Sequence, residues 1–151
     1  MNPVEFLACF HLADLPQFET GKISAVLFPE DEGAVRAILE LARRRRYAIV
    51  PYGGGTSVVG GVETLADGTY AASLTLDLRR MHRVKEVDEH SGLVVAEPGI
   101  RGPLLEEALA AKSLTLGHFP QSWEFSTLGG WIATRAAGGL SNRYGRIDDV
   151  V

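Results

Sequence analysis

The stretch "PYGGGTSVVGG", Pro51–Gly61, holds five glycines within eleven residues and directly follows the apolar run "YAIV". A phosphate-binding P-loop needs a Lys followed by Ser or Thr after its last glycine, whereas the last glycine here is followed by Val62. The Rossmann fingerprint needs glycines at the first, third and sixth positions, but the sixth position counted from Gly53 is Val58. The loop therefore matches neither of these common nucleotide-binding motifs.

The composition of this loop nevertheless suits an anion. Successive backbone N–H groups in a glycine-rich turn can converge on one, and the missing side chains let it approach closely. Thr56 and Ser57 add hydroxyl donors, and no basic residue lies in the loop. Binding by backbone dipoles and hydroxyls suits the bridging diphosphate of a dinucleotide. A glycine-rich turn without a ligand explains the loop equally well, so the loop alone leaves both interpretations open.

The residues before the loop predict a β-α-β unit. "SAVLF" (24–28) and "YAIVP" (47–51) are apolar runs of strand length. Between them, acidic residues come first and arginines last, which complements a helix dipole. Apolar residues recur there at helical spacing: Val35, Ile38, Leu39 and Ala42. We therefore expect two parallel strands in one sheet, joined by a right-handed helical crossover.

The residues after the loop predict an incomplete antiparallel sheet over 71–98. "AASLTLDL" (71–78) alternates in polarity, and "RVKEVDE" and "LVVAEPG" are joined at "HSG" like a hairpin. Helices are expected at 104–112, after Pro103, and within 126–137, closed by glycines at 138 and 139.

A second glycine cluster lies in this last predicted helix. Ser126 and Thr127 occupy a favourable N-cap, and Gly129 and Gly130 lie in the first turn, where each glycine costs about 1 kcal/mol relative to alanine. A helix accepts this cost where something approaches its backbone closely. That partner is either a ligand at the helix N-terminus or another helix packed through small residues.

Composition excludes several classes of function. The 151 residues include 15 basic and 19 acidic ones, so the net charge of -4 argues against a nucleic-acid partner. The single cysteine, Cys9, cannot form an internal disulfide, and no run reaches the roughly 18 apolar residues of a membrane span. We expect a soluble cytoplasmic protein without a metal site, because the histidines are scattered: His11, His82, His90 and His118.

Three segments taken together resemble a known family. They are "VPYGGGTSVVGG", "LTLDLRRMHRVKEVDEHSGLVVAEPGIRGPLLEEAL" and "LGHFPQSWEFSTLGGWIATRAAGGLSNRYGRIDDVV". In this order and spacing they resemble the PCMH-type FAD-binding domain of the vanillyl-alcohol oxidase/para-cresol methylhydroxylase (FAD-linked oxidase) family, closest to alkylglycerone phosphate synthase-like proteins. The resemblance implies an α+β fold: a small parallel β-α-β subdomain followed by a partial, mainly antiparallel α/β subdomain.

The resemblance also implies where FAD binds. The glycine loop would hold the diphosphate, two later segments would line the flavin and ribityl chain, and the glycines between them would allow close approach. The predicted cofactor-binding residues are Pro51, Tyr52, Gly53, Gly54, Gly55, Thr56, Ser57, Gln121, Ser122, Trp123, Glu124, Phe125, Ser126, Thr127, Gly129, Gly130, Thr134, Arg135, Ala136 and Ala137. Relatives that tether FAD covalently through this loop carry a His there, so we expect FAD to be bound non-covalently.

The function implied by the resemblance is flavin-dependent oxidation of a small hydroxy acid or alcohol. One alternative is a synthase of ether-lipid formation without net redox change, although that pattern has an acidic residue at Gln121 and a Ser at Ala137. Another is a non-catalytic flavin- or nucleotide-binding module. Residues 1–23 are read as an N-terminal extension and 24–151 as the N-terminal portion of the FAD domain.

The catalytic residues and the substrate-binding domain are expected outside the chain. The piece by itself should be inactive, should bind FAD weakly or not at all, and should self-associate through its incomplete sheet.

Overall fold

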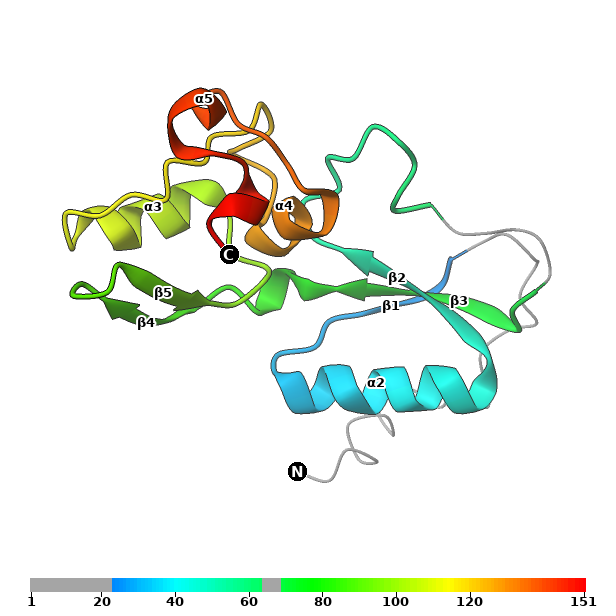
Figure 1. Ribbon diagram of the computed structural model, residues 1–151. Helices are drawn as coiled ribbons and strands as arrows, with labels where there is room; N and C mark the ends of the chain where they lie inside the picture. Colours follow the sequence, from blue (N-terminus) through cyan, green and yellow to red (C-terminus); the bar gives the residue numbers. More distant parts are fainter. Residues whose placement is uncertain (1–22, 64–68) are drawn as a thin grey trace. The chain divides into compact units, whose positions relative to one another are not determined.

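The computed structural model describes residues 23–63 and 69–151 (Figure 1). The chain divides into two compact units. Within the described residues, the first unit holds 23–51, 59–63 and 69–77, and the second holds 52–58 and 78–151. The glycine loop therefore belongs mainly to the second unit, although it follows a strand of the first. The predicted N-terminal extension lies, up to residue 22, outside the described residues.

The first unit contains a three-stranded sheet in the order β1-β3-β2. Its strands are β1 (Ile23–Leu27), β2 (Tyr47–Tyr52) and β3 (Ala72–Asp77), and β1 and β3 are parallel. Figure 1 draws β2 running in the same direction as β3. The predicted strands at 24–28 and 47–51 do share one sheet, as expected, but they are not neighbours in it.

The expectation for residues 71–78 is wrong in one respect. They form the middle strand of the parallel sheet and take no part in the antiparallel one. The alternation of Leu with Ser and Thr predicts a strand with one solvent-exposed face. In the structure, however, residues 73 to 77 of β3 are all buried. A middle strand of a parallel sheet is covered on both faces, so its small polar residues are buried with the leucines.

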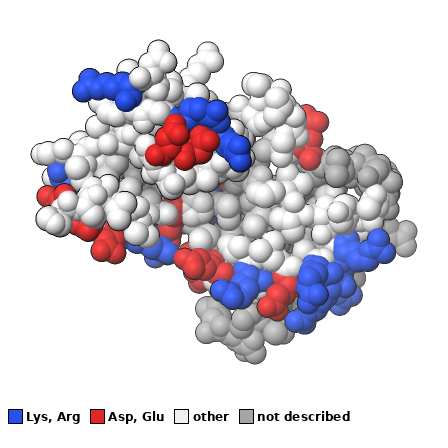
Figure 2. Space-filling view, in the orientation of Figure 1, with Lys and Arg blue, Asp and Glu red and all other residues white. Residues whose placement is uncertain are grey.

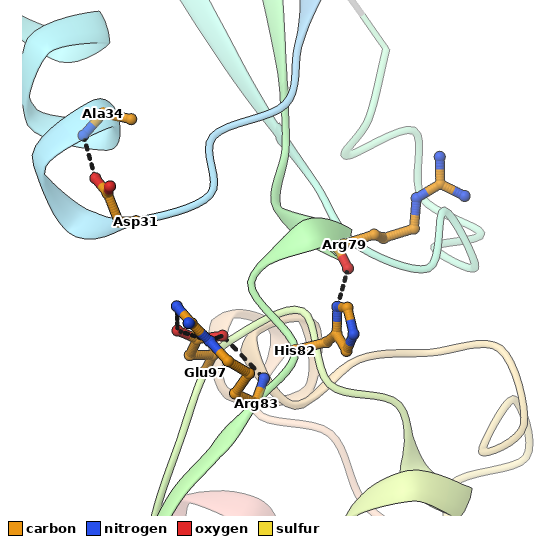
Figure 3. A network of polar contacts seen from close by, with 6 residues as sticks. All are labelled: Asp31, Ala34, Arg79, His82, Arg83 and Glu97. Atoms are coloured by element: carbon orange, nitrogen blue, oxygen red, sulfur yellow. Dashed lines mark hydrogen bonds and ion pairs between the residues drawn. The ribbon is translucent and has the colours of Figure 1, made fainter. Parts of the chain in front are cut away.

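Helix α2 (Glu32–Arg45) connects β1 and β2 as predicted. The Asp31 side chain caps it by accepting a hydrogen bond from the Ala34 N–H at 2.8 Å (Figure 3). The helix ends at Arg46, whose φ of 56° is left-handed. Of the four predicted core positions, Ile38 and Ala42 are buried, whereas Leu39 remains 47% exposed.

The second unit begins with a short antiparallel sheet, as the hairpin pattern predicts. Strands β4 (Val84–Asp88) and β5 (Leu93–Ala96) pair, and the Asp88 carboxylate accepts hydrogen bonds from the N–H groups of His90 and Ser91 in the turn. Helices α3 (Gly102–Ala110), α4 (Leu128–Thr134) and α5 (Ser141–Tyr144) follow. Short 3-10 turns lie at Leu78–Arg80 and Ile147–Asp149.

The core of the second unit joins residues far apart in the sequence. Its fully buried members come from α3, α4, the C-terminal turn and the loop before α3: Ile100, Leu105, Leu109, Trp131 and Ile147. The hairpin adds partly buried valines at 84, 87 and 94. Among the described residues, no helix has the length and apolarity needed to cross a bilayer.

Glu97 and Arg83 hold the base of the hairpin together (Figure 3). The Glu97 carboxylate accepts hydrogen bonds from the Arg83 N–H at 2.8 Å and from its guanidinium at 2.9 Å, while the Glu97 N–H donates to the Arg83 carbonyl oxygen at 2.8 Å. The Glu97 side chain is only 2% exposed. The side-chain hydrogen bond from Arg83 lowers the pKa of Glu97, although burial acts in the opposite direction.

We expect Glu97→Ala to lower the free energy of unfolding by about 1–3 kcal/mol, because it leaves the Arg83 N–H without its acceptor. Urea denaturation at pH 7 measures this change. Glu89→Ala is the control, because Glu89 forms an exposed ion pair with Lys112 and its loss should cost at most about 1 kcal/mol. Equal losses in the two variants would contradict a structural role for the buried carboxylate.

Candidate functional site

Two glycines of the loop, Gly55 and Gly60, have the left-handed backbone conformation that favours glycine. Gly55, the last of the three consecutive glycines, has a φ of +66°. A Cβ there would also meet the Tyr52 ring, with its Cζ only 2.7 Å away. The Tyr52 ring in turn lies 5.3 Å from the Arg79 guanidinium. The first turn of the loop therefore folds back on its own aromatic residue.

The other two glycines pack against the protein itself. A Cβ on Gly54 would strike the Phe125 carbonyl oxygen and lie 2.7 Å from Ser126 Cα, and a Cβ on Gly53 would strike Thr127 Oγ1. The sequence-based explanation was that glycine makes room for an anion. At these two positions the structure gives a different reason, because the space that a side chain would need is already filled by residues 125–127.

The backbone of the loop remains available despite this packing. No hydrogen bond found among the described residues uses the N–H groups of Gly53, Gly54, Gly55 or Thr56. Gly55 and Thr56 are exposed. Successive N–H groups that are not used internally are what an anion-binding turn requires.

The segment from Gln121 to Thr127 is a hydrogen-bonded turn that holds the loop's packing surface in place. The Ser126 N–H and hydroxyl both donate to the Ser122 carbonyl oxygen at 2.8 Å, and the Ser126 hydroxyl accepts from the Trp131 indole N–H at 2.6 Å. Ser126 is 4% exposed. The Ser126 hydroxyl is therefore used for hydrogen bonds inside the protein, and only one of its two acceptor lone pairs remains.

Helix α4 begins as predicted but ends earlier. Thr127 caps it by accepting a hydrogen bond from the Gly130 N–H at 3.4 Å. The N–H of Gly129 donates to the Pro98 carbonyl oxygen at 2.8 Å, and a Cβ on Gly129 would lie 2.7 Å from Pro98 Cβ. Gly129 is thus explained by packing inside the protein. The helix ends at Arg135 in a left-handed conformation, three residues before the predicted glycine stop.

The predicted site residues divide into structural and accessible ones. Ser126 and Thr127 are buried, and the half-buried ones are Tyr52, Gly53, Gly54, Ser57, Ser122, Trp123, Gly129, Gly130 and Ala136. The exposed ones are Pro51, Gly55, Thr56, Gln121, Glu124, Phe125, Thr134, Arg135 and Ala137. All of them except Pro51 belong to the second unit. The exposed members are those able to contact a ligand directly, Gly55 through its backbone and the others also through their side chains.

The structure gives His118, one of the scattered histidines, an unusual environment. It is 3% exposed, its ring lies edge-on to Trp131 at 5.0 Å, and neither ring nitrogen has a hydrogen-bond partner among the described residues. The buried Nε1 of Trp123 also lacks one. Burial lowers the pKa of His118. One sequence feature could have drawn attention to His118, namely its position between two segments that are predicted to bind FAD. Nothing in the described residues groups three or more possible metal ligands.

Comparison with known protein families shows which family the chain belongs to. The model of the FAD binding domain family matches residues 23–151. The chain belongs to this family. FAD is therefore the cofactor of the domain. The resemblance noted from the three sequence segments is confirmed, and so is the fold class with its parallel and small antiparallel sheets.

The relatives of this FAD-binding domain include a synthase and a dehydrogenase. It is 42% identical over 127 residues to an alkyldihydroxyacetonephosphate synthase of Trypanosoma brucei brucei, covering 84% of the chain and 21% of the relative. It is 36% identical over 126 residues to a mitochondrial D-lactate dehydrogenase (cytochrome) of Arabidopsis thaliana, covering 83% and 21%.

A solved alkyldihydroxyacetonephosphate synthase matches with a TM-score of 0.77 at 38% identity, covering 82% of the chain and 23% of that structure. The chain thus spans about a fifth of the length of these relatives.

The chain's own residues fit FAD in two respects. The unused N–H groups of the glycine loop suit a diphosphate, and the exposed turn beside them carries polar side chains, such as Gln121, together with Phe125, which is 61% exposed. A large aromatic side chain exposed next to an anion-binding turn suits a ligand that has both a charged and a ring-bearing part.

The packing of Gly54 gives a prediction that does not depend on the cofactor. Gly54→Ala should lower the free energy of unfolding by about 1–3 kcal/mol in urea without FAD, because the new Cβ overlaps the backbone of residues 125 and 126. Gly139→Ala is the matched control, since its Cβ would meet only the Phe119 carbonyl oxygen at 3.8 Å. If Gly54→Ala is as stable as the wild type and weakens only FAD binding, the packing explanation fails.

The buried His118 predicts a pH dependence of stability. Its pKa is lowered in the folded protein, so below about pH 6.5 the unfolded state binds a proton that the folded state does not bind. The free energy of unfolding should then fall as pH decreases from 7.5 to 5.5, by at most about 1.4 kcal/mol per pH unit. His118→Phe should flatten this slope, whereas His90→Gln, at an exposed position, should not. The same slope in all three proteins would exclude His118 as its source.

Proposed function

We propose that this FAD-binding domain serves a flavoenzyme of the alkyldihydroxyacetonephosphate synthase type, which forms an ether lipid precursor without net redox change. The observation that carries the proposal is the 42% identity to the synthase of Trypanosoma brucei brucei over 84% of the chain. The solved synthase, with a TM-score of 0.77, gives independent support. We therefore prefer the synthase function to the flavin-dependent oxidation that the sequence analysis favours.

Within such an enzyme the chain's residues would bind and orient the cofactor. FAD supplies a ring that can accept electrons or act as an electrophile. We infer that the N–H groups of Gly53 to Thr56 hold the diphosphate. The exposed side chains of Gln121, Glu124 and Phe125 would then lie along the rest of the cofactor, together with the end of α4 at residues 134–137. Ser126 and Thr127 would act indirectly, by fixing the turn on which the loop packs.

Oxidation of a small hydroxy acid is the second candidate. The 36% identity to the D-lactate dehydrogenase of Arabidopsis thaliana supports it. Two positions also depart from the synthase-like pattern, because Gln121 stands where an acidic residue is usual and Ala137 where a Ser is usual. In either case we propose a small-molecule substrate, a cytoplasmic location and catalytic groups contributed by other parts of the enzyme.

Anaerobic spectroscopy of the full-length enzyme loaded with FAD distinguishes the two candidates. Supplied with an acyl ester of dihydroxyacetone phosphate and a long-chain alcohol, a synthase forms the alkyl ether and releases the carboxylate, which mass spectrometry detects. The flavin absorbance near about 450 nm should remain after turnover. Bleaching of this band by D-lactate, without ether formation, would overturn the synthase proposal in favour of the dehydrogenase.

The diphosphate role of the loop can be tested without disturbing its packing. Thr56 is exposed, and Thr56→Val removes one hydroxyl at nearly constant volume. If that hydroxyl donates to the diphosphate, FAD should bind about threefold to tenfold more weakly in the full-length enzyme, measured by quenching of flavin fluorescence. Thr115→Val is the control, because the Thr115 hydroxyl bonds to Glu106 outside the predicted site. Equal affinities in all three proteins would remove Thr56 from the site.

A further inference from the structure

A groove runs along the outer edge of β2 in the first unit, away from every residue proposed for FAD except Pro51. It has a volume of about 470 Å³ and contains all of residues 47–51 of this strand. Leu39, Ala42 and Arg43 of α2 contribute to its lining, as do Gly61, Glu63 and Tyr70 of the following segment. We call it the β2 groove. Its residues all belong to one compact unit.

The strand in this groove has one unpaired edge within the described part of the sheet. In the order β1-β3-β2, β2 has β3 on one side and no strand on the other. An edge strand presents unpaired N–H and C=O groups that another extended chain can pair with. Pro51 lies at the end of the groove and lacks an N–H, which is tolerated at an edge but limits pairing to residues 47–50.

The helix that borders the groove adds an apolar contact and a basic one. Leu39 is 47% exposed on α2, and a second hollow of about 410 Å³ along the same helix shares Leu39 and Arg43 with the groove. Arg43 forms no ion pair or hydrogen bond among the described residues, unlike Arg44, which pairs with Glu40 at 3.2 Å. Within the described part of the chain, Arg43 is therefore an exposed cation at the groove.

The charge around this end of the helix is strongly basic. Arg43, Arg44 and Arg45 occupy the last turn of α2, and Arg46 follows as its C-cap. Figure 2 shows basic side chains gathered over this end of the helix. Among the described residues that line the groove, Glu63 is the single acidic one. An occupant that runs from the groove toward the helix end therefore meets mainly positive charge.

We propose that the β2 groove binds an extended acidic segment of a partner protein by strand addition to β2. The main chain of that segment pairs with residues 47–50, an apolar side chain contacts Leu39, and an acidic side chain pairs with Arg43. The inference is independent of the proposed enzymatic function, because none of these contacts involves the residues assigned to the cofactor.

The test uses the whole chain and a fluorescein-labelled peptide of three Glu-Val-Glu-Ile repeats. Binding should be saturable by fluorescence anisotropy, should weaken as salt is added, and should be lost with the corresponding Lys-Val-Lys-Ile peptide. Hydrogen exchange should slow at alternate amides within residues 47–50, those that do not face β3, when the acidic peptide is bound. Slowed exchange elsewhere, and not in β2, would overturn the strand-addition geometry.

Matched variants separate a specific site from general attraction. Arg43→Glu should weaken the acidic peptide roughly fivefold to tenfold, because an attraction becomes a repulsion. Leu39→Ser should weaken it without changing its dependence on salt. Arg143→Glu, an equal charge reversal at an exposed position on α5, should change affinity less than about twofold.

Three results would overturn the proposal. The first is equal binding to the wild type and Arg43→Glu. The second is slow exchange, in the isolated chain, of the β2 amides that do not face β3, which would mean that the edge is covered from within. The third is a dimer, detected by light scattering, that slows hydrogen exchange in β2 without any peptide. A second copy of the chain would then be the occupant of the groove.

Discussion

The close approach of two backbones is the constraint on which the second unit depends. Gly53 and Gly54 lie so near residues 125–127 that a single methyl group at either position would overlap them. The same turn then caps α4 through Thr127 and receives the Trp131 indole on Ser126. One contact thereby links the glycine loop to the helix cap and, through Trp131, to the core of this unit.

This arrangement changes how the glycines are understood. A loop rich in glycine suggests a ligand, yet Gly53, Gly54 and Gly129 are each accounted for by protein atoms that a Cβ would strike. Among the described residues, no hydrogen bond uses the N–H groups of Gly53 to Thr56. Our proposal that these groups hold the diphosphate is compatible with the packing, because the packing occupies the side-chain positions and not these backbone donors.

The two units also differ in where their polar groups are used. In the second unit, Glu97 is buried but fully engaged by Arg83, whereas the buried nitrogens of His118 have no partner within the described residues. In the first unit, the arginines at the end of α2 are exposed, and the described part of the sheet has no strand on the outer side of β2. A buried charge that is paired and hydrogen-bonded contributes to the stability of the fold. At a polar group without a partner, the binding of a proton, ligand or partner protein changes the free energy most.

The sequence by itself determined the elements and the family. Local patterns located α2, the β4–β5 hairpin and the Thr127 cap, because helix capping and alternation depend on neighbouring residues. Only the tertiary structure decided the rest. It placed residues 72–77 between β1 and β2, buried His118, and filled the space beside Gly54 with a segment some seventy residues later. These outcomes depend on contacts between distant parts of the chain, and no periodicity within one segment records them.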